Sequence, residues 1–358
     1  MDKLCKDIKK YFQEIGFKRL DEEDKNGVYR IESELEMDSK NFTVAIMHHK
    51  KPRTITFQIN SEYRFNKNNF PKTLFIADLI NMTLMNIGSI AINLETAEIT
   101  ITSNLYLSNK GVNEYQFKST LKRIFNQLQL CRDLIQKVDQ DNEDPLEVII
   151  DFDDEIWEAM KPKPEDQPDF VDQYFVDIPG RVSLKDDREL IVMDMQLCLQ
   201  NEGLPIINEA EHQNESKNRS TQIVESWFKF NSQVFRLQAL YTPETDIVGF
   251  EISGFQPIKD EYASNYIYLF NWINQMQMRN WWVLCPEINQ ILFRGGFVIS
   301  DGKLVKYQFS KLIKNSIENL KLFYPLVVDQ ENVGKDVVDS ILRFSGDNII
   351  KIGRFHNK

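Results

Sequence analysis

The stretch Tyr115-Gln116-Phe117 returns 192 positions later as Tyr307-Gln308-Phe309, and an amphipathic run with helical spacing follows each copy. Two further echoes occur in the same order along the chain: Phe12 to Phe17 against Leu199 to Leu204, and Ile80-Asn81 against Ile273-Asn274. Because the order of the echoes and the kinds of element around them agree, the sequence predicts a tandem repeat of one folding unit.

The composition is that of a folded, acidic chain. Of 358 residues, 42% are hydrophobic and 24 are Phe, which is enough to fill the cores of two domains. The net charge of −11 repels phosphate backbones and anionic lipid at long range, so neither nucleic acid nor a membrane is an expected partner. An apolar leader and runs of roughly 18 apolar residues are both lacking, which predicts a cytoplasmic protein.

Each repeat is predicted to be an α-β-β-β-α-β-β-α unit of α+β class, with an antiparallel sheet covered by helices. Helical and strand periodicity alternate along the chain, and turn residues separate the runs. The first repeat is expected to hold helices over 4–15, 71–84 and 115–137, and strands over 29–35, 42–47, 54–59, 89–94 and 98–105. The second is expected to hold helices over 190–201, 262–279 and 304–323, and strands over 222–230, 234–241, 247–255, 281–284 and 290–299.

One helix of the second repeat is ambiguous. Residues 190–199 also alternate as a strand would, and only the echo with the first repeat favours a helix there.

These elements divide the chain into four parts. Residues 1–138 form the first repeat, 139–185 an acidic linker with several Pro, 186–330 the second repeat and 331–358 a C-terminal tail. Between 139 and 189 there are 18 acidic residues against five basic ones, a composition that resists a packed core. The early and late echoes have different spacings. A polar stretch at 209–220 is the expected insertion that accounts for this difference.

Motifs for catalysis or metal binding are not evident, so no catalytic residue, metal or cofactor is predicted. The cysteines have no metal-ligand or disulfide spacing and are expected to be free thiols, two of them buried in helices: Cys5, Cys131, Cys198 and Cys285. The histidines do not converge and are expected at the surface: His48, His49, His212 and His356.

Tryptophan is concentrated in the second repeat. Trp281 and Trp282 are adjacent on a predicted strand, so their side chains must point to opposite faces. One of them is expected in the core, and the other is expected to face solvent, the linker, the sister repeat or a partner. Trp227, Trp281 and Trp282 are therefore the candidate protein-binding residues.

The order of elements carries a family resemblance. Together with Ile80-Asn81 before a hairpin led by Gly88, and the long helix after Tyr115-Gln116-Phe117, it resembles the YbjN-like family, whose fold is that of type III secretion chaperones. The resemblance covers roughly 1–138 and 186–330. It implies an acidic cytoplasmic protein that binds other polypeptides, with no catalytic residues to carry over. Two units in one chain imply a monomeric pseudo-dimer spanned by the linker.

The sequence thus favours a non-catalytic, chaperone-like or regulatory module that captures a segment of a partner polypeptide. Sheet edges and apolar grooves would hold the segment, and the acidic surface would favour a basic or amphipathic one. Two alternatives stay open, a hydrolase with its site between the repeats and a structural scaffold. A pocket with converging ionisable groups would favour the enzyme, and an open apolar groove the binding module.

Overall fold

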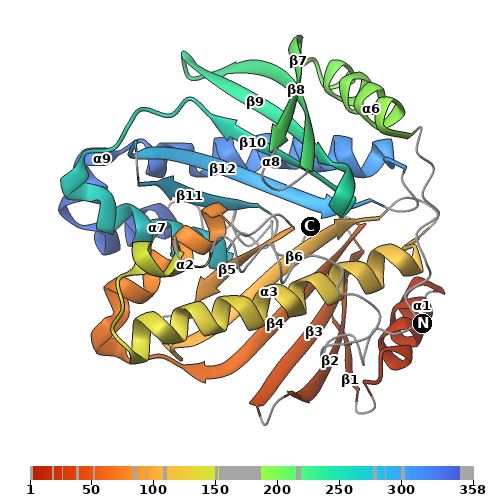
Figure 1. Cartoon of the computed structure of the whole chain (residues 1–358), viewed down its shortest axis with the longest axis horizontal. Helices are drawn as coiled ribbons and strands as arrows, with labels where there is room; N and C mark the ends of the chain where they lie inside the picture. Colours follow the sequence, from red (N-terminus) through yellow and green to blue (C-terminus); the bar gives the residue numbers. More distant parts are fainter. Residues whose placement is uncertain are drawn as a thin grey trace. The chain divides into compact units, whose positions relative to one another are not determined.

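The computed structural model describes residues 3–17, 20–25, 27–37, 40–50, 53–83, 87–93, 95–107, 111–149, 152, 187–214, 219–276, 280–286, 288–299 and 303–346. The chain forms two compact units, divided between residues 180 and 181. Figure 1 colours the first unit from red to yellow and the second from green to blue. The fold is α+β, and each unit contains one six-stranded antiparallel sheet.

In the described residues of the first unit, three helices accompany the sheet, and 145–149 form a further short helical segment. The helices are α1 (Lys3–Glu14), α2 (Phe70–Thr83, preceded by the short η1, Lys67–Asn69) and α3 (Glu114–Gln140). The strands are β1 (Asp21–Lys25), β2 (Val28–Met37), β3 (Lys40–Lys50), β4 (Arg53–Arg64), β5 (Gly88–Ile92) and β6 (Glu98–Tyr106). They lie in the order β1-β2-β3-β4-β6-β5, and α3 packs against α2, β4 and β6 (Figure 1).

The second unit contains the same kinds of element. Its helices are α6 (Asp187–Asn201), α7 (Ala263–Met276), α8 (Lys306–Val327) and α9 (Gln330–Lys335), with short turns η3 (Pro243–Thr245) and η4 (Asp260–Tyr262). Its strands are β7 (Ile206–Asn214), β8 (Arg219–Phe230), β9 (Gln233–Thr242), β10 (Ile247–Ser253), β11 (Trp281–Cys285) and β12 (Gln290–Val298). α6 packs against α8 and β8, and α7 packs against β11.

The two sheets correspond strand for strand. Counted from β7, the second sheet has the order β7-β8-β9-β10-β12-β11, which matches the order of the first sheet from β1. The pairing register agrees as well, because Val44 faces Ile59 in the first sheet and Leu237 faces Ile252 in the second, each 193 positions later.

Each unit has one strand more than the sequence predicted. The missed strands are β1 and β7, each of which forms one edge of its sheet. β7 covers part of the stretch 209–220 that was expected to be a polar insertion. β1 consists of Asp21, Glu22, Glu23, Asp24 and Lys25, and all five residues are exposed. Residues of this kind have low strand propensity, so periodicity does not reveal a charged edge strand.

The first helix of each unit ends in the same turn. Gly16 and Gly203 have φ of 110° and 77°, a left-handed conformation that favours Gly at a helix end. The amide of Phe17 donates to the carbonyl of Phe12 over 3.4 Å, and the amide of Leu204 donates to the carbonyl of Leu199 over 2.9 Å. These bonds explain why this stretch of sequence echoes.

The Ile-Asn echo has a structural role in both units. Asn81 accepts from the amide of Ile90 and donates to its carbonyl, both over 2.8 Å. Asn274 does the same to Trp282, over 2.8 Å and 2.9 Å. Both Asn side chains are buried, and each satisfies the backbone of an outermost strand, β5 or β11, on the side away from its neighbouring strand.

Some predicted boundaries lie elsewhere or outside the described residues. α3 continues to Gln140, past the predicted end of the first repeat, and most of the predicted linker 139–185 lies outside the described residues. In the C-terminal tail, residues 337–346 are helical, and residues 347–358 lie outside the described residues.

Candidate protein-binding surfaces

The three candidate tryptophans have different environments. Trp281 and Trp282 on β11 are both buried, with 2% and 0% of their surface exposed. Trp282 contacts the rings of Phe255, Phe270 and Phe293, with centroids 4.5–6.0 Å away. Neither residue of the pair is therefore at an exposed surface, which corrects the expectation for any solvent-facing role. Trp227 on β8 is 44% exposed.

Trp227 lies on the same face of the second sheet as the buried Trp281, at a position where this face is exposed. Arg236 faces it on β9 and forms an ion pair with Glu225, and Gln238 donates to the same Glu225 carboxylate over 2.8 Å. The Gln238 hydrogen bond and the Arg236 guanidinium hold the pKa of Glu225 below its usual value. Val234, on the same strand as Arg236, is 51% exposed. The surface around Trp227 thus combines apolar side chains with a fixed ion pair.

Exposed apolar side chains are distributed unequally between the units. Among the described residues, eleven of the twelve large hydrophobic side chains that are exposed belong to the second unit. They are Leu190, Met193, Leu197, Ile207, Trp227, Val234, Ile288, Tyr307, Val328, Val338 and Leu342; Leu146 is the one in the first unit. Single exposed hydrophobic residues are ordinary, so what distinguishes the second unit is their number.

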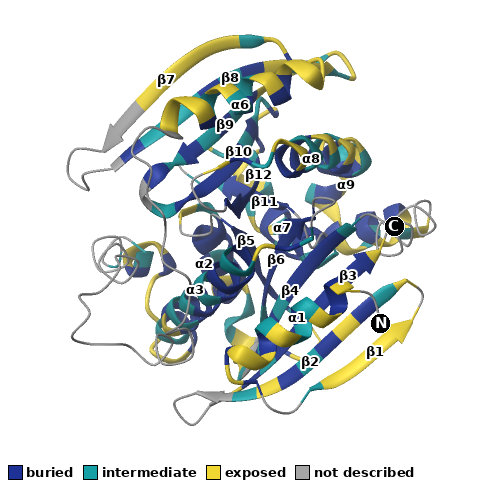
Figure 2. Cartoon of the chain, turned by 90° about the vertical axis from the view of Figure 1, so that its right-hand side faces the viewer, coloured by how far each residue is buried: buried dark blue, intermediate teal, exposed yellow. Residues whose placement is uncertain are grey.

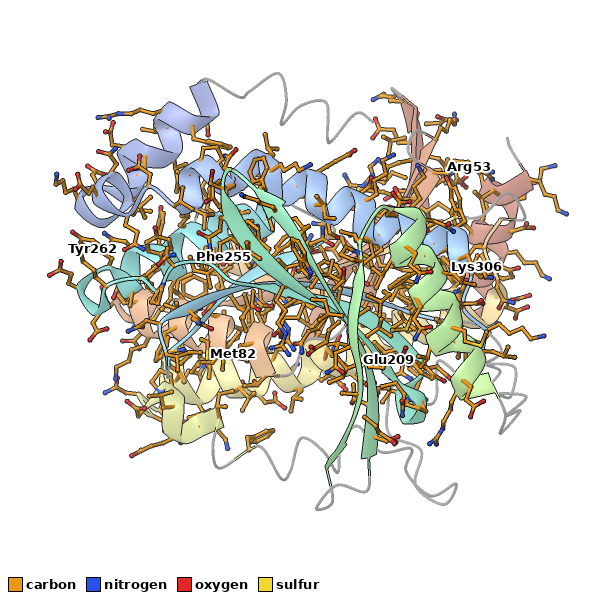
Figure 3. The ribbon with its side chains drawn as sticks, turned by 90° about the horizontal axis from the view of Figure 1, so that it is seen from above. Arg53, Met82, Glu209, Phe255, Tyr262 and Lys306 are labelled. Atoms are coloured by element: carbon orange, nitrogen blue, oxygen red, sulfur yellow. The ribbon has the colours of Figure 1, made fainter. Side chains whose placement is uncertain are left out.

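α6 contributes three of these residues from one face. Its opposite face is buried through Ile191, Met195 and Leu199. Lys306 at the start of α8 forms an ion pair with Asp194 over 2.8 Å, and the two helices lie side by side (Figure 3). The sequence did not predict this surface. Apolar residues on two faces of one helix hide the helical period, so the ambiguity between helix and strand at 190–199 was the available sign of a second apolar face.

A cavity of about 360 Å³ lies in the second unit, between the end of β10 and the turn from α8 to α9. Its apolar walls include Phe255, Ile291 and Val327, and Tyr324 forms part of the same lining. Asp329 and Glu331 also belong to its lining, and the Asp329 carboxylate accepts a hydrogen bond from the amide of Asn332.

One edge strand of each sheet, β1 or β7, is acidic. β1 carries four carboxylates, and β7 carries the exposed Glu209 and Glu211. Figure 2 colours much of both strands as exposed. Figure 3 labels Glu209 on β7. Charged side chains on an edge strand oppose pairing with copies of the same edge, and they leave its backbone groups for a segment of opposite charge.

The histidines depart from expectation where they are described. His48 and His49 on β3 are 1% and 9% exposed, so they are buried rather than at the surface. The Sγ of Cys5 lies 3.7 Å from Nδ1 of His48. The side chain of His212 and all of His356 lie outside the described residues. Within the described ranges, His, Cys, Asp and Glu form no group that could hold a metal ion.

The four cysteines are free thiols with unequal access. Cys5, Cys131 and Cys198 are buried, and Cys285 is partly exposed. Burial raises the pKa of the Cys131 and Cys198 thiols, which further lowers their reactivity. In the native chain we expect one thiol, Cys285, to react rapidly with a disulfide reagent, and all four to react after denaturation. Rapid reaction of two or more native thiols, measured by absorbance of the released thiolate, would contradict these environments.

Comparison of the chain with family models, with curated proteins and with solved structures found no significant match. Across the part of the chain that the structure describes, no helix combines the length and apolar character needed to cross a membrane.

Proposed function

We propose that this chain is a non-catalytic, chaperone-like or regulatory protein-binding module, and that its second unit captures a segment of a partner polypeptide. The observation that carries the proposal is the concentration of exposed apolar side chains in that unit, eleven of twelve among the described residues. Residues of this kind lower the solubility of a monomer, and covering them with a partner removes that cost.

The proposal includes a duplication. Equal strand order, equal register and the paired asparagines Asn81 and Asn274 support one ancestral unit that is present twice. A single chain would then do what a dimer of small units does, as in the YbjN-like family and the type III secretion chaperones that the sequence resembles. The polar surface of the first unit fits a supporting role, and the second unit takes the role of binding.

The surfaces of the second unit suggest the mode of capture. The exposed edge of β7 can pair with an extended segment through backbone hydrogen bonds, while the neighbouring apolar side chains select the residues that flank this segment. Glu209 and Glu211 on that edge favour a segment with Lys or Arg. The hydrolase and the scaffold remain alternative predictions. Neither has an observation in the described residues that favours it over binding.

A peptide selection with the full chain tests this proposal. The immobilised chain is panned against a displayed peptide library, and the affinities of enriched peptides are measured for two variants. Trp227→Ala should weaken binding about tenfold, the usual effect of truncating an aromatic contact residue at about 1.4 kcal/mol. Glu34→Ala is the matched control, because Glu34 faces Thr43 in the first sheet as Trp227 faces Arg236 in the second.

We expect the control variant to bind like the wild type. Enrichment of no peptide, or equal losses in the two variants, would contradict capture by the second unit.

A further inference from the structure

The outer face of α6 differs from that of its counterpart α1 in one respect. Buried positions correspond at a spacing of 187: Leu4, Ile8 and Phe12 in α1 match Ile191, Met195 and Leu199 in α6, and all six are buried. The outward positions of α1 in the same alignment are Lys3, Lys6 and Lys10, all exposed. In α6 those positions are Leu190, Met193 and Leu197, which are 56%, 53% and 43% exposed.

The outer positions of this helix are not required for folding. The helix packs on its sheet through its inner face in both units, so the outer positions are not needed for folding, and Lys serves at all three in the first unit. An apolar side chain at each of the same three positions therefore points to a surface that becomes covered. The three residues, called the α6 stripe, recur at i, i+3 and i+7, the spacing with which one helix contacts another.

A second copy of this chain is a poor occupant. A stable dimer buries about 800 Å² per partner with roughly 20–30 residues a side, whereas the α6 stripe offers three half-exposed side chains. In helix-on-helix contact Glu189 and Asp194 occupy the positions that flank the stripe. A second α6 would bring the same two carboxylates to that seam, and Asp194 already has Lys306 as its partner.

We propose that the α6 stripe docks an amphipathic helix of the partner polypeptide, with Lys or Arg beside the apolar stripe of that helix. The apolar face covers Leu190, Met193 and Leu197, and a cation next to it meets the exposed Glu189. This inference rests on the proposed function and assigns the α6 surface and a helical conformation to a part of the partner other than the extended segment at β7.

Synthetic helical peptides test the assignment with the full chain. The probe is a fluorescent peptide of Leu, Lys and Ala, with Leu at the contact positions and Lys beside them; a second peptide carries Glu in place of Lys, and a third has the first composition scrambled. The variant Leu190→Lys, Met193→Lys, Leu197→Lys gives α6 the residues of α1. Ser264→Lys on α7 adds charge at an exposed position of the same unit, outside α6, and serves as the control.

We expect the Leu and Lys peptide to bind at physiological salt, measured by fluorescence anisotropy, and the stripe variant to bind it at least about tenfold more weakly. The control variant should keep most of the affinity, and the Glu and scrambled peptides should bind weakly. The melting temperature of the stripe variant should match the wild type, because the first unit tolerates Lys at these positions.

Three results would overturn the assignment. Equal peptide affinity in the stripe variant and the wild type would show that the α6 stripe does not bind the peptide. A fall of several degrees in the melting temperature would show that this chain's own residues cover the stripe. A dimer in sedimentation that the stripe variant loses would make a second copy the occupant. In each of these cases, continued binding of the peptides selected from the library would leave the proposed function standing, so that only the helical assignment fails.

Discussion

Replacement of Trp282 by Ala is expected to lower the free energy of unfolding of the second unit by roughly 3–5 kcal/mol, as truncation of a core aromatic does. Trp282 has 0% of its surface exposed, and its ring lies 4.5 Å from that of Phe293 and 5.4 Å from that of Phe255. Its removal leaves a large cavity among rings that are fixed by their own strands and helices, so the space does not close.

Denaturant unfolding followed by circular dichroism measures this loss, and Trp227→Ala is the matched control. Trp227 is 44% exposed, so its replacement should change the free energy of unfolding by only about 0.5 kcal/mol. If Trp282→Ala destabilised the chain no more than Trp227→Ala, the aromatic core of the second unit would be wrongly described.

Replacement of Asn274 by Leu, or of Asn81 by Leu, is expected to cost roughly 2–5 kcal/mol. Each Asn makes two hydrogen bonds to the backbone of an outermost strand, and Leu of similar size makes neither. A buried backbone group left without a partner costs about 1–3 kcal/mol, and each substitution leaves one donor and one acceptor in that condition.

The control for these variants is Ser264→Leu, at an exposed position on α7. It should change stability by about 0.5 kcal/mol at most. Because the asparagines occupy equivalent places, the two losses should also be similar in size. A large loss for one asparagine and none for the other would argue against equivalent units.

Much of the fold can be predicted from the sequence, because its echoes mark positions with strict physical demands. Gly16 and Gly203 end helices in a left-handed turn, and Asn81 and Asn274 bind strand backbones. These positions tolerate few other residues, so the same residue types stand at corresponding places in both units. The missed strand β1 shows the limit, since five exposed charged residues carry no periodic signal.

The candidate site was harder to predict, because exposure depends on what covers a residue. Alternation correctly places Trp281 and Trp282 on opposite faces of β11, but it cannot tell whether the second face is open, and both are buried. The α6 stripe was hidden for a related reason. Apolar residues on two sides of one helix remove the polar face by which a surface helix is recognised.

Oxidative footprinting of the full chain, with and without a peptide from the library selection, tests capture by the second unit most directly. Met193 and Trp227 are 53% and 44% exposed, and their side chains are among the most readily oxidised. We expect bound peptide to slow oxidation of at least one of them several-fold, while side chains of the first unit react at an unchanged rate. Protection confined to the first unit, or peptide binding that protects neither Met193 nor Trp227, would contradict capture by the second unit.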